Sequence, residues 1–318
     1  MEATEPKERS QEAPEFTVFV TCYYEEKSID EFYGRLSATM ESLGRPYEIL
    51  MVNDGSLDGT WSKLKAIFEK DPNVAAVVDF FKNAGQQAAI TALIGLARGR
   101  VFILMDSDLQ LAPEEIPMLV AEYDKGFDLV SGYRKNRRDS FFRIVPSKIA
   151  NMIMRKASQS TFRDFGCTFK IYNAGLIRAF SFGPHHVFSN VDAIAKAGRC
   201  REVAVTHYPR KYGKSGWTFR KLWQYNMDNV VKLSQRPFQI LAAACVFVSF
   251  LFFCRILSGF LLPYKILDEV TTGLVLNALV VAVLLLIAVL SLIGEFTIRC
   301  FLHLQKTPAY IVREKLTR

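Results

Sequence analysis

The most informative chemistry in this sequence is a pair of aspartates, Asp106 and Asp108, directly after the apolar run VFILM. Residues two apart in an extended chain share a face, and the predicted strand ends here, so both carboxylates could converge on one point. With the amide of Gln110 they offer the oxygen ligands that Mg²⁺ or Mn²⁺ prefers. Such a cation would hold a diphosphate. The alternative is that these acids are solvated turn formers.

A second polar element weakens that alternative. The sequence NDGSLDGT follows another apolar run, YEILMV, and carries Asp54 and Asp58. Parallel sheets bind ligands beyond the carboxyl ends of their strands, where Asp54 could accept hydrogen bonds from a base or a ribose. Asp58 suits the N-terminal cap of a helix that begins near Thr60.

Several other chemistries lack sequence support. The chain has no GxGxxG motif, and the GKS tripeptide at Gly213 lacks the upstream glycine of a P-loop. Hydride transfer and P-loop phosphoryl transfer are therefore not indicated. The 6 cysteines form no CxxC pair, which argues against a disulfide framework and a zinc site and favours a reducing compartment for the polar part.

The elements that must position these acids alternate between strand and helix patterns. Apolar, β-rich runs predict strands that start at Phe16, Tyr47, Val74, Val101 and Phe127. Helical spacing predicts helices over Ser28–Leu43, Thr60–Lys70, Gln86–Arg98 and Pro113–Lys125. This alternation predicts an α/β fold with a parallel, doubly wound sheet, which brings both acidic elements to one edge.

The C-terminal part of the chain is much more apolar than the rest. Ile240–Leu262 and Leu274–Gly294 each hold about 20 largely apolar residues, enough for a membrane-spanning helix. The linker between them is short, so they predict a hairpin, and the basic flanks place everything except the linker in the cytoplasm. The alternative is a pair of buried helices in a globular core.

Charge and amphipathicity suggest which partners the chain meets. The net charge is +8 over 318 residues, which suits nucleic acid, an anionic membrane or phosphorylated substrates. The basic residues cluster beside the predicted spans, which favours membrane lipids over nucleic acid. Phe141–Ala157 and Trp217–Leu233 mix aromatic and basic residues as interfacial helices do, although ordinary amphipathic helices on the core would show the same pattern. The polar residues 1–15 predict a disordered tail rather than a signal peptide.

At this point the motifs resemble a known family. FVTCYYEE, VNDGSLDGT, MDSDLQ followed by PEEIP, and DLVSGYR resemble the family-two glycosyltransferases with the GT-A fold, and most closely the polyprenyl-phosphate glycosyltransferases. The resemblance implies a Rossmann-like, mostly parallel sheet, then interfacial amphipathic helices and a two-helix transmembrane hairpin. The domain boundaries expected are a tail (1–15), a cytoplasmic catalytic domain (16–216), an interfacial helix (217–236), the hairpin (237–296) and a cytoplasmic C-terminal tail (297–318).

The resemblance also implies roles for particular residues. The metal, Mg²⁺ or Mn²⁺, would be bound by Asp106, Asp108 and Gln110. The acceptor phosphate would be held by Arg134, Arg143 and Ser147, and a later loop carrying Arg210, Lys211 and Ser215 would close on the diphosphate or the acceptor. The nucleotide side of the site would include Tyr23, Glu25, Asp54 and Asn83, and Asp164 matches a further acid whose role is less certain. Cys22, Tyr24 and Lys82 depart from the family pattern and leave the base and the sugar open.

The expected reaction follows from this arrangement. A sugar would pass, with inversion, from a nucleotide-sugar donor to a polyprenyl (undecaprenyl) phosphate at the cytoplasmic face of the inner membrane. A lipid phosphate is already an anion, so it needs no general base, and positioning and electrostatics carry the rate. The alternatives are a lipid hydroxyl acceptor, which would need a base, an inactive membrane scaffold, and a transporter. Family resemblance further suggests a homo-oligomer, a tetramer.

Overall fold

One mixed sheet forms the centre of the larger unit. A computed structural model of the protein describes residues 13–135, 152, 155, 162–182, 187–212, 247–248, 268–304 and 308–318. The chain divides into two compact units, Met1–Asn229 with Thr307–Arg318, and Val230–Lys306. The described strands are β1 (Phe16–Cys22), β2 (Tyr47–Asn53), β3 (Val74–Phe80), β4 (Val101–Asp106), β5 (Leu129–Arg134), β6 (Lys170–Asn173), β7 (Cys200–Val205) and β8 (Val312–Thr317).

The strand order is β7-β5-β6-β4-β1-β2-β3-β8. Strands β3, β2, β1 and β4 are parallel, whereas β6 and β8 run antiparallel to their neighbours. The register aligns Thr21 with Asp106 and Cys22 with Asn53, and Asn53 in turn with Asp79. The carboxyl ends of the four central strands therefore meet at one edge, as predicted.

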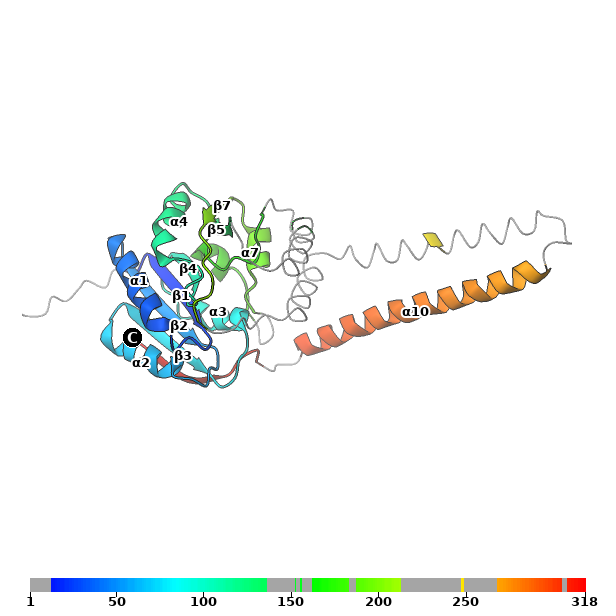
Figure 1. The fold of residues 1–318 in the computed structure, drawn as a ribbon, viewed down its shortest axis with the longest axis horizontal. Coiled ribbons are helices and arrows are strands. Elements are labelled where there is room, and N and C mark those ends of the chain that lie inside the picture. The colour runs from blue at the N-terminus through cyan, green and yellow to red at the C-terminus, as the bar shows by residue number, and fades with distance from the viewer. Residues whose placement is uncertain are drawn as a thin grey trace, which may run out of the picture. The chain divides into compact units, whose positions relative to one another are not determined.

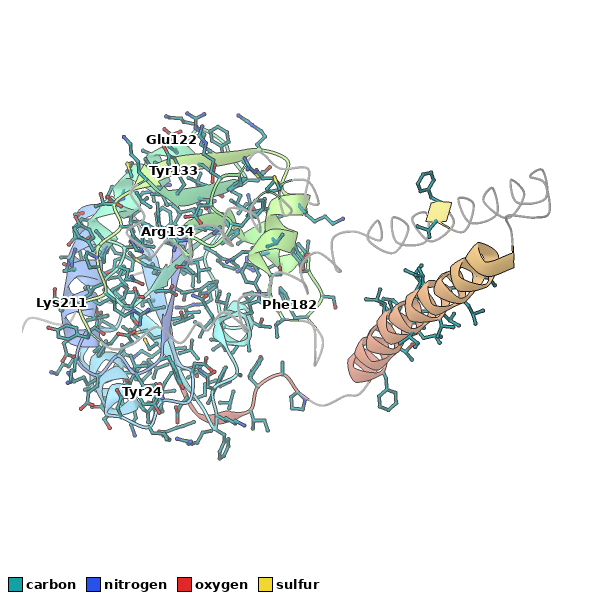
Figure 2. All side chains as sticks on the ribbon, turned by 45° about the vertical axis from the view of Figure 1, so that its right-hand side comes forward. Tyr24, Glu122, Tyr133, Arg134, Phe182 and Lys211 are labelled. Carbon is teal, nitrogen blue, oxygen red and sulfur yellow. The ribbon has the colours of Figure 1, made fainter. Side chains whose placement is uncertain are left out.

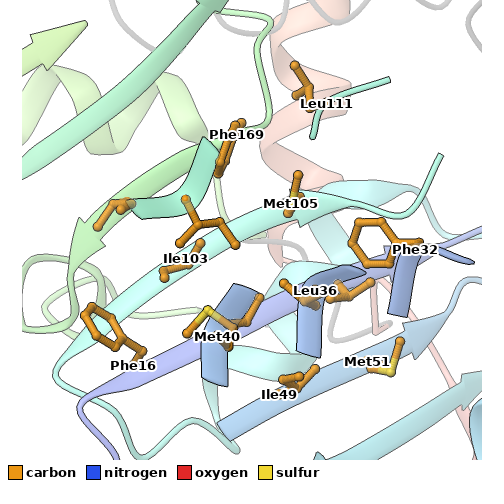
Figure 3. Packing of buried hydrophobic residues seen from close by; sticks show 14 of the residues in the cluster. Phe16, Phe32, Leu36, Met40, Ile49, Met51, Ile103, Met105, Leu111 and Phe169 are labelled. Carbon is orange, nitrogen blue, oxygen red and sulfur yellow. The ribbon is translucent and has the colours of Figure 1, made fainter. Parts of the chain in front are cut away.

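Helices cover both faces of the sheet (Figure 1), with α1 and α4 on one side and α3 and α7 on the other. The helical segments of this unit are α1 (Ile29–Ser42), α2 (Thr60–Lys70), α3 (Gln86–Ile94), the 3₁₀ turn Pro113–Glu115, α4 (Ile116–Tyr123), α6 (Ala174–Arg178) and α7 (Asn190–Lys196). Figure 3 shows Leu36 and Met40 of α1 packed over Ile49 of β2 and Ile103 of β4. This core fixes the sheet edge on which the acids lie.

The strands predicted from Phe16, Tyr47, Val74 and Val101 are confirmed, as is the helix Thr60–Lys70. The helix predicted to reach Arg98 was wrong at its end, because α3 stops at Ile94 and two glycines follow. Gly99 lies so close to β1 that a Cβ there would be 2.6 Å from Thr17 Oγ1. The chain therefore leaves the helical conformation after Ile94, and Gly99 packs closely against β1 just before β4 begins. The fifth strand begins at Leu129, two residues later than predicted.

The C-terminal residues hold a strand that was not predicted from the sequence. Residues 297–318 were expected to be a tail, but Val312–Thr317 forms β8, an antiparallel edge strand on β3. The sequence VREKLT is too charged to stand out as a strand, and charged side chains are typical of edge strands. Figure 1 draws this strand in red beside β3.

The second unit is described mainly by α10 (Asp268–Leu304), which contains the predicted span Leu274–Gly294. Among the described residues, no helix proves both long and apolar enough to cross a membrane. Of the predicted span Ile240–Leu262, only residues 247 and 248 are described, and the predicted interfacial segments fall almost wholly outside the described ranges.

Candidate active site

The acidic turn begins where β4 ends, beside β1. The main-chain N–H of Gln110 donates to Asp108 Oδ1 over 3.1 Å, which closes a tight turn. Leu109 within it has φ = 58°, a left-handed conformation that costs about 1–2 kcal/mol in a residue other than glycine. This backbone strain is stored at the point where the two aspartates leave the sheet.

Asp106 is the point at which three separate segments meet. Its Oδ1 accepts hydrogen bonds from Thr21 Oγ1 of β1 (3.0 Å) and from Gln86 Nε2 at the start of α3. Its Oδ2 accepts from Thr168 Oγ1, just before β6, over 2.7 Å. A carboxylate has about four acceptor sites, so Asp106 keeps room for roughly one further ligand.

Asp108 stands close enough to Asp106 for their charges to interact. Burial, together with the negative charge of Asp108, raises the pKa of Asp106 to about 6, although the hydrogen bonds from Thr168 and Thr21 and the charge of Arg210 oppose the shift. Asp108 is itself paired with a cation, since Arg210 Nη2 lies 2.6 Å from its Oδ2. Two adjacent carboxylates that favour a positive partner fit a hard divalent cation. No cluster of three or more His, Cys, Asp or Glu side chains suited to a metal occurs among the described residues.

Asp54 organises the loop that precedes α3. Its carboxylate accepts from the main-chain N–H groups of Ala84 (2.7 Å) and Gly85 (2.9 Å) and from Asn83 Nδ2 (2.9 Å). Burial raises its pKa to about 6, although these backbone bonds oppose the shift. Because Gln86 follows directly and contacts Asp106, the loop ties the two acidic elements together.

Residues 54–56 form a tightly packed corner on the same edge. A Cβ on Gly55, which has φ = 68°, would lie 2.4 Å from the carbonyl carbon of Lys82. Ser56 accepts from the main-chain N–H of Tyr24 (2.9 Å) and donates its own N–H to Asn53 Oδ1 (3.3 Å). Only a glycine can lie this close to the backbone of Lys82. The corner therefore fixes the position of residue 55 relative to the loop that holds Asp54.

Tyr23 and Tyr24 form an exposed aromatic pair above this corner. Their ring centroids lie 4.7 Å apart in an edge-to-face arrangement, and Tyr24 has φ = 57°. Figure 2 marks Tyr24 at the periphery of the unit. Exposed aromatic faces beside Asp54 are suited to contact with a planar ligand.

Glu25 is a buried acid near the aspartate pair. It accepts a short hydrogen bond from Ser28 Oγ. Burial raises its pKa to about 7, and Asp108 adds to that shift while the Ser28 bond and Arg210 oppose it. A carboxyl group that titrates near neutrality could accept or donate a proton.

Arg134, at the end of β5, is held by Asp164 through two parallel bonds, Nε–Oδ2 at 2.7 Å and Nη2–Oδ1 at 2.9 Å. Burial favours the neutral acid, but the bonds and charge of Arg134 outweigh it and hold the pKa of Asp164 below its usual range. The fully buried Lys170 donates to the main-chain carbonyls of Phe165 and Cys167 in the same loop. Since this loop also carries Thr168, it joins Arg134 to Asp106.

Residues 206–212 cross the acidic turn. The N–H of Tyr208 donates to the carbonyl of Gln110 over 2.9 Å, and Arg210 reaches Asp108. Lys211 instead pairs with Glu31 of α1 at 2.7 Å, so its amino group is held by a helix rather than by the aspartates (Figure 2).

The structure thus brings many of the expected site residues to one edge. The group consists of Tyr23, Glu25, Asp54, Asn83, Asp106, Asp108, Gln110 and Arg210, and the Thr168 loop links Arg134 and Asp164 to it. Lys211 is turned toward α1. Arg143, Ser147 and Ser215 lie outside the described residues. Thr21, Gln86 and Thr168 were not predicted from the sequence, although aligning the ends of the neighbouring strands could have found Thr21.

Comparison with known proteins identifies the family of this chain. The family model "Glycosyl transferase family 2" matches residues 17–183. An undecaprenyl-phosphate 4-deoxy-4-formamido-L-arabinose transferase of Salmonella paratyphi A is 36% identical over 71% of this chain and 69% of its own length. The protein of the same name from Serratia proteamaculans is 31% identical over 94% of this chain and 93% of its own.

Among solved structures, glucosyl-3-phosphoglycerate synthase from Mycobacterium tuberculosis, bound to phosphoglyceric acid, is similar in fold. Its TM-score is 0.51 at 15% identity, with 69% of this chain and 79% of that chain covered. The sheet with its acidic edge is that of a GT-A glycosyltransferase. The chain belongs to glycosyl transferase family 2.

The corner at Gly55 yields a testable prediction. Gly55→Ala should destabilise the fold well beyond the cost of a left-handed alanine, about 1–2 kcal/mol, because its Cβ would meet the backbone of Lys82. Gly44→Ala is the matched control, since Gly44 has φ = 63° and nothing within 4 Å of an added Cβ. Urea unfolding of both variants measures the difference, and equal losses would show that the corner is not tightly packed.

The raised pKa of Asp54 predicts how stability changes with pH. Its ordinary value of 3.8 rises to about 6 in the folded chain, so the folded state binds more protons between those values. The folded state should therefore gain stability as pH falls from 7 to 5. Relative to Asp54→Asn, the wild type should gain about 1 kcal/mol over this window, measured by thermal unfolding at both pH values. A difference that stays constant with pH would contradict the shift.

Proposed function

We propose that this glycosyltransferase moves a sugar from a nucleotide-sugar donor to a polyprenyl phosphate, in a single inverting displacement at a membrane surface. The observation that carries the proposal is the acidic turn, where Asp106 and Asp108 lie together with Arg210 at the sheet edge. The names of the relatives, which specify undecaprenyl phosphate, support the choice of acceptor.

The donor side rests on the aspartates and the Asp54 loop. Asp108, Asp106 and Gln110 would hold Mg²⁺ or Mn²⁺. When bound, that cation neutralises the charge that develops on the departing diphosphate. A fold relative, glucosyl-3-phosphoglycerate synthase, was crystallised with Mn²⁺ and uridine-diphosphate-glucose (TM-score 0.50), which supports a divalent cation. Asp54, through its loop, would orient the nucleoside.

The acceptor side rests on arginines. Asp164 fixes the plane of the Arg134 guanidinium through two bonds, which suits forked recognition of a phosphate. Arg143 and Ser147 are expected to add contacts to the same phosphate. Arg210, which pairs with Asp108 in this structure, would exchange that partner for an anionic substrate oxygen. These groups position two anions and need no general base.

A second candidate is transfer to a lipid hydroxyl, and the buried Glu25 favours it. Such an acceptor must lose a proton, and a carboxyl group with a pKa of about 7 near Asp108 and Arg210 is a suitable base. The two candidates differ in whether Glu25 must accept a proton from the acceptor. A phosphate acceptor leaves Glu25 with only a supporting role.

The acceptor lipid implies membrane attachment, and we assign it to the hairpin 237–296. Apolar side chains of α10 that are exposed in the structure support this assignment, among them Leu279, Leu286, Leu290 and Phe296. Exposed apolar side chains on a helix are stabilised when lipid or another apolar partner covers them. The catalytic unit would then lie at the cytoplasmic face, with the homo-oligomer as a further expectation.

The proposal predicts the result of a donor and acceptor screen. Purified full-length protein with Mn²⁺ should transfer label from one member of a nucleotide-sugar panel to undecaprenyl phosphate, and EDTA should abolish transfer. Asp108→Asn should lower kcat by at least about 100-fold because one cation ligand loses its charge. Asp58→Asn, in the neighbouring loop, should leave kcat within about twofold, since Asp58 lies one residue before Gly59, which is the N-cap of α2 in place of the predicted Asp58, and it only accepts from the N–H and hydroxyl of Thr60.

The same assay separates the two candidates. Glu25→Gln should keep most transfer to undecaprenyl phosphate, and the product should have the opposite anomeric configuration to the donor. Retention of configuration would contradict the single displacement. Transfer to diacylglycerol but not to the lipid phosphate, lost in Glu25→Gln, would replace the first candidate with the second.

A further inference from the structure

The C-terminal strand carries an arginine in an unusual register. Asp79 of β3 pairs with Glu314 of β8, but the next residue, Phe80, pairs with Val312. Arg313 is therefore an extra residue in the ladder, and such bulges commonly re-aim a side chain. Here Arg313 Nη1 lies 3.1 Å from Asp79 Oδ2.

The partner of Arg313 is a fully buried carboxylate. Asp79 has 0% exposure, and its second oxygen accepts from Asn53 Nδ2 over 2.7 Å. Asn53 Oδ1 accepts from the N–H of Ser56, whose hydroxyl in turn accepts from the N–H of Tyr24. A continuous series of hydrogen bonds thus runs from the C-terminal strand to the residues flanking Asp54.

Arg313 also holds the other side of the same corner. Its Nη2 donates to the carbonyl of Phe81 over 3.0 Å, and its guanidinium lies over the Phe81 ring at 5.3 Å. Phe81 leads into Lys82 and Asn83, whose backbone packs on Gly55. Asn83 then donates to Asp54. Both routes from Arg313 therefore end at the Asp54 loop.

We propose that Arg313 is a positioning residue for the donor: from the C-terminal strand it sets the geometry of the loops 53–56 and 81–85 that bind the nucleotide. The inference rests on the proposed function for its ligand, but its structural part stands on the contacts above. Without the guanidinium, Asp79 is a buried charge that has lost its cation, and such charges displace their neighbours or admit water. Asn53 and Phe81 are the neighbours that would move.

The chain supplies a matched control at the other end of the same strand. Arg318 also fastens β8, donating to the main-chain carbonyls of Asp71 (2.8 Å) and Phe68. It lies beside Ala75, four residues before Asp79 on β3, about 13 Å away along the strand. If Arg313 merely secured the strand, Arg313→Met and Arg318→Met would have equal effects.

The first readout does not depend on the reaction. Hydrogen–deuterium exchange of full-length protein should rise in peptides covering 53–57 and 81–85 in Arg313→Met, and stay at the wild-type level there in Arg318→Met. The second readout is binding of nucleoside diphosphates with Mn²⁺ by calorimetry, using UDP, GDP, CDP and ADP. For the base that the wild type binds, Arg313→Met should raise Kd about tenfold and Arg318→Met less than about twofold.

A second variant keeps the test decisive if Arg313→Met folds poorly. Asp79→Asn with Arg313→Met removes the buried charge but retains an acceptor for Asn53, so it should recover most of the lost affinity. Equal exchange and equal Kd in the two single variants would overturn the inference, as would increased exchange with unchanged Kd. If the wild type binds none of the four nucleotides, the proposed function fails and the positioning role fails with it, whatever the exchange data show.

Discussion

The site depends on a carboxylate that the fold places beside the sheet edge and surrounds with donors. Asp106 ends β4 and accepts from Thr21, Gln86 and Thr168, so one acid connects β1, the start of α3 and the loop before β6. The cost of this placement appears as a pKa raised to about 6. Hydrogen bonds offset part of that cost, and a cation would offset more.

The other parts of the site are arranged around this connection. Gln86 is preceded by the loop that Asp54 holds, and Thr168 belongs to the loop that supplies Asp164 to Arg134. The Asp54 loop and Arg134 are therefore fixed to the same carboxylate by two short loops. Tyr24 and Leu109 both have left-handed φ, and this strain is tolerated because the segments that carry them are held by neighbouring contacts: the N–H of Tyr24 donates to Ser56 Oγ, and the turn at Leu109 is closed by the bond from Gln110 to Asp108.

The features that depend on local sequence pattern, such as buried strands and the acids at their ends, could be predicted from the sequence. Buried parallel strands are apolar runs, so β1 to β4 and the acids at their ends were found at the right residues. Thr21 and Thr168 were missed because a threonine that serves a carboxylate looks like any strand threonine until the register is known. Strand β8 and Arg313 were missed because the pairing partner Asp79 is more than 200 residues away, and a charged edge strand has little apolar signal.

The central claim is that Asp106 and Asp108 together hold a divalent cation on the donor diphosphate. Electron paramagnetic resonance of Mn²⁺ bound to the full-length protein with a ¹⁷O-labelled nucleoside diphosphate tests it most directly. The account predicts that ¹⁷O broadens the Mn²⁺ lines in the wild type and that bound Mn²⁺ is lost in both Asp106→Asn and Asp108→Asn. Bound, ¹⁷O-broadened Mn²⁺ that persists unchanged in the two variants would contradict it.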